Sequence, residues 1–207
     1  MLFRSGLALF LTSFVMAPVF QRAYETAYVP YRSGEIGVEQ AGGRALAVQA
    51  DTADEADVLR LFETVDREFG AVTGLVNNAG ITQPVKFLDI TGGDYDRILD
   101  VSLRGTLYAS QAVIPSMIAQ NSGSIVCISS VSAQRGGGIL GGPHYSAAKA
   151  GVLGLARAMA REYGGNNIRV NCVTPGLIAT DIIKGKDRKS TRLNSSHMSE
   201  SRMPSSA

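Results

Sequence analysis

The sequence predicts an α/β domain in which a parallel sheet is covered by helices on both faces. From Ala45 onward, short apolar runs of strand length alternate with longer runs at helical spacing, which is typical of strands joined by crossover helices. Ligands of such sheets bind beyond the carboxyl ends of the strands. Asp51, Asn78, Ser130 and Pro175 each follow a predicted strand, which places candidate binding residues on one edge.

Composition supports one domain of ordinary size. The chain has 207 residues, of which 45% are hydrophobic, enough to fill a core. Cys127 and Cys172 stand inside predicted strands, where we interpret them as small buried apolar residues in a reducing compartment. No cluster of His, Cys or Asp has the spacing of a metal site.

The net charge of +2 is unevenly distributed along the chain. Residues 184–207 carry six basic and two acidic residues, so the remainder of the chain is slightly acidic. Nucleic acid is therefore not an expected partner. Residues 184–207 are also rich in serine and poor in large apolar residues, so we expect a disordered, non-native tail.

Residues 1–32 form an atypical apolar segment in which we predict no strand, leaving an edge of the sheet open. Ser5–Phe20 contains no charged residue and stands after a single basic residue, Arg4. Three interpretations stay open: a truncated or mispredicted start, an export signal, or a membrane span, for which the run is short. Residues 33–183 make up the predicted domain.

The first half of this domain is expected to begin with the end of a helix over Gly34–Ala41, closed by Gly42 and Gly43. Ala45–Ala50 is predicted to be a buried strand. Thr52 and Glu55 have capping-box spacing, and an apolar stripe at helical spacing follows them. Gly74–Val76 is the next predicted strand. Asp94–Gln120 is predicted to form a long helix, in which Pro115 could cause a kink or an early end.

The second half is predicted to contain a strand over Ser124–Ser130, a helix over Tyr145–Tyr163 and a strand over Ile168–Val173. The glycine-rich interval Gly136–Gly142 resembles a dinucleotide fingerprint, but it is too far from the preceding strand for a tight turn. We interpret it as a flexible loop on the substrate side. Arg135 and His144 are candidate substrate contacts, with an ordinary turn residue as the alternative for His144.

Tyr145 and Lys149 form the most informative pair in the sequence. Four positions apart on a helix, they share one face. A nearby ammonium stabilises a phenolate, so the tyrosine could exchange a proton with an alcohol or carbonyl oxygen. Ser130, at the end of the preceding strand, could hydrogen-bond the same oxygen. On its own the pair is a weak signal, because a solvated helix face would show the same spacing.

Four segments in order resemble the short-chain dehydrogenase/reductase family: Asn77–Gly80, Ser129–Val131, Tyr145–Lys149 and Pro175–Thr180. The resemblance covers Ser33–Ile183. It implies a Rossmann-like fold that here lacks the usual first strand–turn–helix and the last strand. It also implies a catalytic set and a set of residues along NAD or NADP. The catalytic set is Ser130, Tyr145 and Lys149, with Ser132 as a competitor for Ser130; the cofactor set is Asp51, Asn78, Ala79, Gly80, Tyr145, Lys149, Pro175, Gly176, Ile178 and Thr180.

The chain departs from the family pattern at two places. The family commonly carries an asparagine within a proton relay where this chain has Ser102, which leaves Ser102 a doubtful catalytic residue. The family's glycine-rich phosphate turn is absent from Met1–Arg32, which contains Gly6 alone, so we expect weak NAD(P) binding.

Two functions follow from these observations. The first is a cytoplasmic NAD(P)-dependent oxidoreductase that interconverts a secondary alcohol and a ketone, such as a 3-oxoacyl compound, a sugar or a polyol. The alternative is a non-catalytic truncated member of the family that folds or oligomerises without cofactor. The expected partners are a small-molecule alcohol or ketone and further copies of the chain, because two helices carry apolar residues on more than one face. A membrane partner is not expected.

Overall fold

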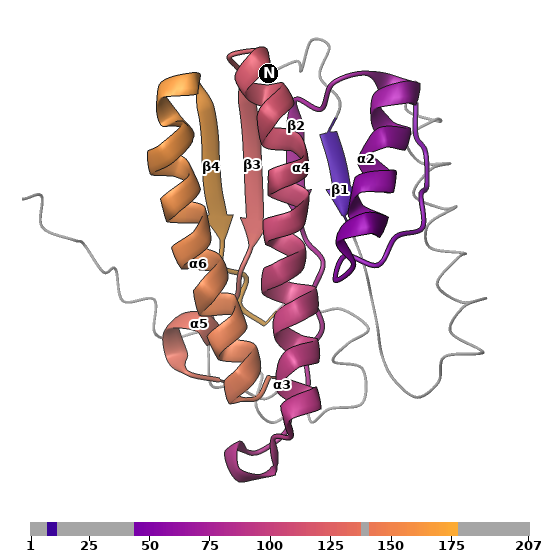
Figure 1. The fold of residues 1–207 in the computed structure, drawn as a ribbon. Coiled ribbons are helices and arrows are strands. Elements are labelled where there is room, and N and C mark those ends of the chain that lie inside the picture. The colour runs from indigo at the N-terminus through magenta and orange to yellow at the C-terminus, as the bar shows by residue number, and fades with distance from the viewer. Residues whose placement is uncertain (1–7, 12–43, 138–140, 178–207) are drawn as a thin grey trace, which may run out of the picture. The chain divides into compact units, whose positions relative to one another are not determined.

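A computed structural model describes residues 8–11, 44–137 and 141–177. The chain divides into two compact units, Met1–Gly176 and Leu177–Ala207. In the described part of the first unit, a parallel sheet has the strand order β1-β2-β3-β4 (Figure 1). The strands are β1 (Ala8–Leu11), β2 (Gly74–Asn77), β3 (Gly123–Ile128) and β4 (Ile168–Val173). The predicted parallel α/β fold is confirmed.

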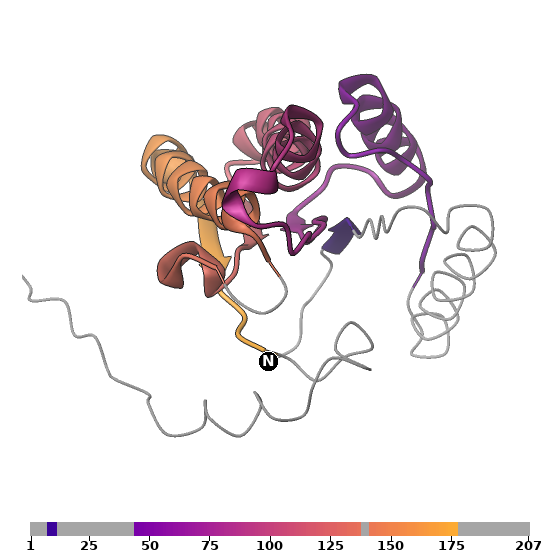
Figure 2. The same cartoon turned by 90° about the horizontal axis from the view of Figure 1, so that it is seen from below.

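Three long helices lie over the same face of the sheet, as the view along the strands shows (Figure 2). The described residues thus show one of the two helical layers that the sequence predicts. The long helices are α2 (Glu55–Phe69), α4 (Gly105–Ala119) and α6 (Pro143–Tyr163), and the shorter ones are α3 (Gly92–Leu99) and α5 (Ser132–Arg135). Phe87–Asp89 and Gly164–Asn166 form 3₁₀ turns.

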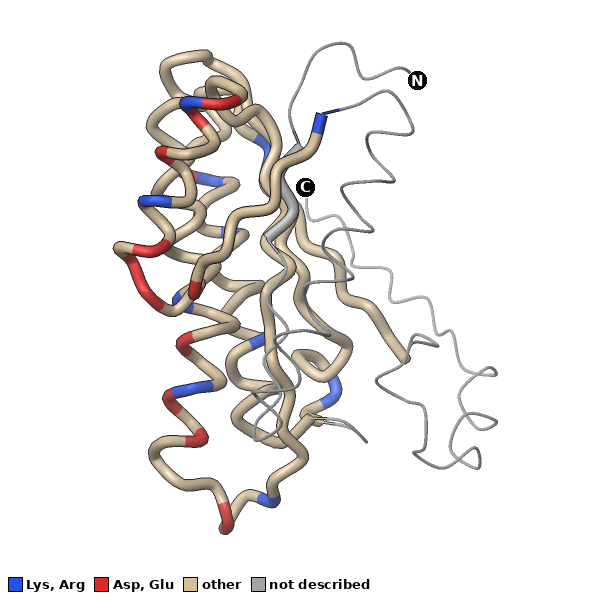
Figure 3. The backbone as a smooth tube through the Cα atoms, turned by 90° about the vertical axis from the view of Figure 1, so that its right-hand side faces the viewer, with Lys and Arg blue, Asp and Glu red and all other residues tan. Residues whose placement is uncertain are grey.

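The core lies between this helical layer and the sheet. Leu75 of β2 and Ile125 of β3 are almost fully buried, and they belong to one cluster with Met117 of α4 and Val152 of α6. Each such side chain contributes about 1.5–3 kcal/mol when it leaves water. Acidic and basic residues are interspersed along the helices, whereas the strands carry few of either (Figure 3). The core therefore fixes the helices over the strands and leaves the strand ends free to form a site.

The N-terminal apolar segment contributes an edge strand. The sequence indicates no strand there, yet Ala8–Leu11 pair in parallel with Gly74–Asn77. An apolar run of strand length suits a buried parallel sheet, where alternation is not required. The edge of β2 is consequently covered, which removes the open edge that we expect from the sequence.

The predicted strand Ala45–Ala50 is wrong. These residues belong to no strand of the structure, and Leu46 is 43% exposed. The hydrogen-bonded sheet of the described residues comprises β1 to β4 alone, and Ala45–Ala50 are not part of it. Val48 and Ala50 still pack against the core, so the apolar pattern reports partial burial rather than pairing.

The predicted capping box at Thr52 is also wrong. Helix α2 takes Asp54 as its N-cap, and the Asp54 carboxylate accepts the backbone N–H of Asp57 at 2.8 Å. Thr52 is instead buried, and its Oγ1 has no hydrogen-bond partner among the described residues. A carboxylate nearer the helix competes well for the free N–H groups, because it also interacts favourably with the helix dipole.

The predicted long helix over Asp94–Gln120 is divided. It begins at Gly92 after a capping box in which Thr91 and Asp94 satisfy each other's backbone N–H groups. A π turn over Asp100–Arg104 then separates α3 from α4. Such turns are often found at functional sites, and this one contains Ser102.

Some predictions fall outside the described residues: the helix end over Gly34–Ala41, Ile178 and Thr180 of the cofactor set, and the tail. Among the residues that the structure covers, no helix has the length and apolar character to cross a bilayer.

Candidate active site

The candidate site lies at the carboxyl ends of β2, β3 and β4, which point toward the lower edge of the sheet in Figure 1. The ends of β3 and β4 are joined beyond the strands. Ser129 N donates to Val173 O at 2.8 Å, and Val131 N donates to Pro175 O at 3.1 Å. These bonds bring the predicted residues Ser130 and Pro175 onto neighbouring segments.

Lys149 is hydrogen-bonded to the end of β3 through both its side chain and its backbone carbonyl. Its Nζ donates to the Ile128 carbonyl at 2.8 Å, while its own carbonyl accepts the Ser129 hydroxyl at 2.7 Å. The side chain is buried, and burial lowers the pKa of Lys149 to about 8 from the ordinary 10.5. At pH 7 the site therefore still holds a buried ammonium.

Gly80 and Ser102 approach this ammonium. A Cβ atom added at Gly80 would lie 3.0 Å from Lys149 Nζ and 3.6 Å from Ser102 Oγ. Ser102 is fully buried, and its Oγ has no hydrogen-bond partner among the described residues. A buried hydroxyl without a partner costs free energy, so this point suits a polar group from outside the chain.

Tyr145 lies beside Lys149 in the first turns of α6. The ammonium is 6.0 Å from the centroid of the tyrosine ring. The half-buried ring packs against a small apolar cluster that includes Ile81, Ile98 and Ala148. The predicted pair is thus brought together, one residue held by polar contacts and the other by apolar contacts.

Ser130 is nearly buried just beyond β3. Its Oγ accepts the backbone N–H of Ser132 at 3.1 Å, which leaves its own O–H available to donate. Ser132, the competing candidate, begins the short helix α5 and is equally buried. Gly136 closes this helix with φ 78°, a left-handed conformation that favours glycine.

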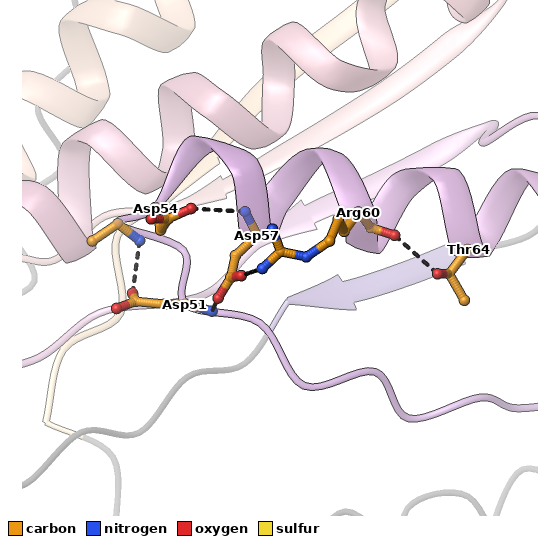
Figure 4. Close-up of polar contacts among 6 residues, drawn as sticks. Asp51, Asp54, Asp57, Arg60 and Thr64 are labelled. Carbon is orange, nitrogen blue, oxygen red and sulfur yellow. Dashed lines mark hydrogen bonds and ion pairs between the residues drawn. The ribbon is translucent and has the colours of Figure 1, made fainter.

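Asp51 has a local structural role in the structure (Figure 4). Its carboxylate accepts the Ala53 N–H at 2.9 Å, and its own N–H donates to the Asp57 carboxylate at 3.0 Å. Asp57 also forms an ion pair with Arg60. These contacts form an Asx-type turn that leads into α2.

The residues after β2 divide by burial. Asn78 is exposed and Ala79 is buried. Asn77, for which the sequence predicts only a place at the strand end, is buried and donates to Ser110 Oγ at 3.1 Å. The sequence could have indicated this role of Asn77, because an amide at the end of an apolar strand needs a hydrogen-bond partner when it is buried.

His144 is neither a turn residue nor an exposed substrate contact. It lies in α6 and is 2% exposed, with Nε2 3.2 Å from Gln83 Oε1. Arg135, the other candidate substrate contact, ends α5 and is exposed.

The two cysteines do not form a reactive site. Both are free, and burial raises the pKa of Cys127 to about 11, which disfavours the thiolate. Among the described residues no group of three His, Cys, Asp or Glu could hold a metal ion.

Tyr145, the buried Lys149 side chain and Ser130 thus lie at the carboxyl edge of a parallel sheet, where such sheets bind their ligands. A sequence profile described as short chain dehydrogenase matches residues 31–191, and the chain belongs to this family. The family resemblance that the sequence indicates is therefore confirmed.

Individual relatives give the same result. An uncharacterized short-chain type dehydrogenase/reductase of Sinorhizobium fredii is 59% identical over 70% of this chain and 57% of its own length. A 3-oxoacyl-[acyl-carrier-protein] reductase of Synechocystis is 40% identical over 68% of this chain and 56% of its own. The chain thus spans little more than half the length of these relatives.

Among solved structures, a crystal structure from Burkholderia xenovorans described as a short-chain dehydrogenase/reductase aligns with a TM-score of 0.66 and 32% identity. The alignment covers 72% of this chain and 58% of that one.

Members of this family bind NAD or NADP, and part of the described site fits such a cofactor. Lys149 Nζ and the Ser102 hydroxyl, which has no partner among the described residues, both lie near the position of a Cβ atom at Gly80, and they are the polar groups there that would hold such a cofactor.

Proposed function

We propose that this chain carries the catalytic part of an NAD(P)-dependent oxidoreductase that interconverts a secondary alcohol and a ketone. The observation that supports it best is the Lys149 ammonium, buried and fixed at the end of β3 beside the ring of Tyr145. A buried charge is costly to maintain, and such costs are typical of functional sites.

In this proposal Tyr145 moves a proton to or from the substrate oxygen. The Lys149 charge stabilises the phenolate that Tyr145 becomes after giving up its proton. Ser130 donates its free O–H to the same oxygen and so orients the carbonyl. NAD(P), when bound, supplies or accepts the hydride. Ser102 would hydrogen-bond a polar group that lies opposite Lys149. Tyr145 could regain its proton through that group.

The proposed cofactor contacts follow the strand ends. Asn78, Ala79 and Gly80 would lie along the cofactor after β2, and Pro175 and Gly176 beside the nicotinamide after β4. Ile178 and Thr180 would continue the second group, and Asp51 would lie near the adenine. The proposed cofactor is NAD or NADP.

The substrate that we propose is a 3-oxoacyl thioester. Several relatives carry the name 3-oxoacyl-[acyl-carrier-protein] reductase, and one, 36% identical over 72% of this chain, carries the name acetoacetyl-CoA reductase. Sugars and polyols are the alternative substrate class. We also propose that the protein acts in the cytoplasm as a homo-oligomer.

Tyr145→Phe tests the proposal, because it removes only the hydroxyl. In a version extended to the full length of its relatives, we expect turnover of a 3-oxoacyl thioester with NADH or NADPH to fall by about 10²–10⁴-fold. Cofactor affinity, measured in parallel by fluorescence titration, should be unchanged. A variant that keeps more than about a tenth of the rate would show that Tyr145 is not the acid.

The second candidate is a family member that folds without catalysis. It is favoured by one observation: no glycine stands between β1 and Gly34, in the stretch where the family places its phosphate turn. Cofactor titration separates the two candidates.

A further inference from the structure

A chain of side-chain hydrogen bonds lies beneath the first turn of α6 and takes no part in the chemistry above. His144 Nε2 lies 3.2 Å from Gln83 Oε1, and Gln83 Nε2 donates to Asp94 Oδ1 at 2.6 Å. Asp94 Oδ2 accepts the Thr91 hydroxyl at 2.6 Å and the Thr91 N–H at 3.1 Å. The chain joins three segments: the loop after β2, the start of α3 and the start of α6.

The chemistry of these groups fixes which atom donates at each step. Hydrogen bonds from Thr91 and Gln83 hold the pKa of Asp94 at about 2, so its carboxylate only accepts. Gln83 therefore presents its NH₂ to Asp94 and its carbonyl oxygen to His144. That oxygen can only accept, so His144 must donate from Nε2. A neutral ring then carries no proton on Nδ1.

The surroundings keep the His144 ring neutral. Burial lowers the pKa of His144, and the Asp94 carboxylate opposes this shift only in part. His144 Nδ1 has no hydrogen-bond partner among the described residues. A second proton would have to enter at this nitrogen, which would place a charge in a buried position without a partner. The ring is therefore held in one tautomer.

The backbone of the same segments is closely packed. Gly142 N donates to Gln83 O at 2.9 Å, and a Cβ atom at Gly142 would lie only 2.6 Å from Val85 O and 2.9 Å from the His144 ring. The loop after β2 thus rests directly on the start of α6. In Figure 1 α3 lies at the same lower edge as this end of α6.

Tyr145 directly follows His144, and its ring packs against the same segments. Its apolar neighbours include Ile81, from the loop after β2, and Ile98, from α3. The residues that hold His144 and those that hold Tyr145 therefore belong to one packed unit.

We propose that His144 is a positioning residue: clamped in its Nε2–H form by Gln83 and Asp94, it fixes the first turn of α6 and thereby the place of the Tyr145 ring beside Lys149. The catalytic consequence rests on the proposed function, whereas the clamp itself is a property of the folded chain.

Nuclear magnetic resonance of the unmodified chain tests the clamp without any turnover. The sequence contains two histidines, His144 and His197, so ¹⁵N-histidine labelling gives two ring systems that a His197→Gln variant assigns. We expect the His144 ring to show the Nε2–H tautomer alone between pH 6 and 8. An Nδ1–H tautomer, or a tautomeric mixture, would overturn the proposal.

Matched substitutions test the positioning. His144→Gln keeps a nitrogen donor that can reach Gln83, whereas His144→Leu removes it. With ¹³C-labelled tyrosine, assigned through Tyr145→Phe, we expect the Tyr145 ring signal to shift in the Leu variant and to return to the parent position in the Gln variant. An unchanged Tyr145 signal in a folded Leu variant would overturn the proposal.

If the Leu variant does not fold, Gln83→Met tests the same proposal, because it removes the hydrogen-bond partner of His144 without a change in α6. We expect the His144 ring to lose its single tautomer and the Tyr145 signal to move. A Gln83→Met variant in which both stay as in the parent would overturn the proposal. In a catalytically active full-length version, His144→Leu should lower kcat about tenfold or more at unchanged KM, and His144→Gln should restore it. Absence of turnover in the parent would contradict the proposed function and leave the tautomer result standing.

Discussion

Two regions of the molecule are held in place by different interactions. One is the end of β3 together with α6, and the other is the segment Arg44–Asp54. β3 is paired with β2 on one side and β4 on the other. Its end holds α6 through the bonds of Lys149 and Ser129. Arg44–Asp54 belongs to no strand and is largely exposed before Asp51. Aspartate side chains turn the end of this segment into α2 (Figure 4), and Val48 and Ala50 pack against the core.

This difference indicates where in the fold a buried charge can be stabilised. An ammonium needs acceptors whose positions do not move, and a strand paired on both sides supplies a carbonyl of that kind at its end. An exposed turn supplies carboxylates that are solvated and can rearrange. This contrast supports the proposal that the acid–base chemistry takes place at the end of β3.

Lys149→Met should have the largest effect, because it removes the ammonium and leaves the Ile128 carbonyl without its donor. Turnover of a full-length version should fall by about 10²-fold or more. In the parent, the folded pKa of Lys149, about 8, lies below the ordinary 10.5, so the folded state releases this proton first as pH rises. Parent stability relative to the Met variant should therefore climb between pH 8 and 10.5, at up to about 1.4 kcal/mol per pH unit.

Urea unfolding of the two proteins at pH 7.5 and 9.5 measures this climb, and subtraction cancels the groups that they share. Equal pH dependence in parent and variant would show that the folded state does not lower the pKa of Lys149.

Gly142→Ala should have the next largest effect. The added Cβ would meet the backbone oxygen of Val85 at 2.6 Å, and backbone cannot move aside as a flexible side chain can. We expect a loss of about 1–3 kcal/mol of stability. Gly154→Ala is the matched control, because it is exposed on α6 with nothing within 4 Å of the new atom. There the better helix propensity of alanine should add about 0.5–1 kcal/mol. Urea midpoints that move in the same direction for both variants would contradict this packing.

The smallest effects are expected at the turn into α2. Asp54→Ala removes the N-cap and should cost about 0.5–2 kcal/mol. Thr52→Val should be neutral or slightly stabilising, because it removes a buried hydroxyl that has no partner among the described residues. Thermal unfolding of the two variants measures both effects. If Thr52 were the N-cap, Thr52→Val would be more destabilising than Asp54→Ala.

Much of the site could be predicted from the sequence because its signals are local. Helix spacing alone places Tyr145 and Lys149 on one face, and the apolar run Ile168–Val173 is a strand with those bounds. Helix α6 begins two residues before the predicted start, because Pro143 suits the first turn of a helix.

What could not be predicted depends on residues far away in the chain. Whether Ala45–Ala50 forms a strand is decided by a neighbouring strand, and the same applies to Ala8–Leu11 beside β2. The contact of His144 with Gln83 joins residues 61 positions apart, so spacing gives no sign of it. The π turn at Ser102 likewise interrupts a sequence whose helical pattern is continuous.

The central claim is that this chain holds the catalytic end of an NAD(P) site while the stretch after β1 contains no glycine-rich phosphate turn. Calorimetric titration of NADH and NADPH tests it most directly. The ligands are added to the unmodified chain and to a version in which the residues after β1 are replaced by a family-like glycine turn and helix. We expect a dissociation constant weaker than about 1 mM for the unmodified chain and micromolar binding for the replaced version. Micromolar binding by the unmodified chain would contradict the account, because residues 12–33 would then have to form a phosphate site without glycine.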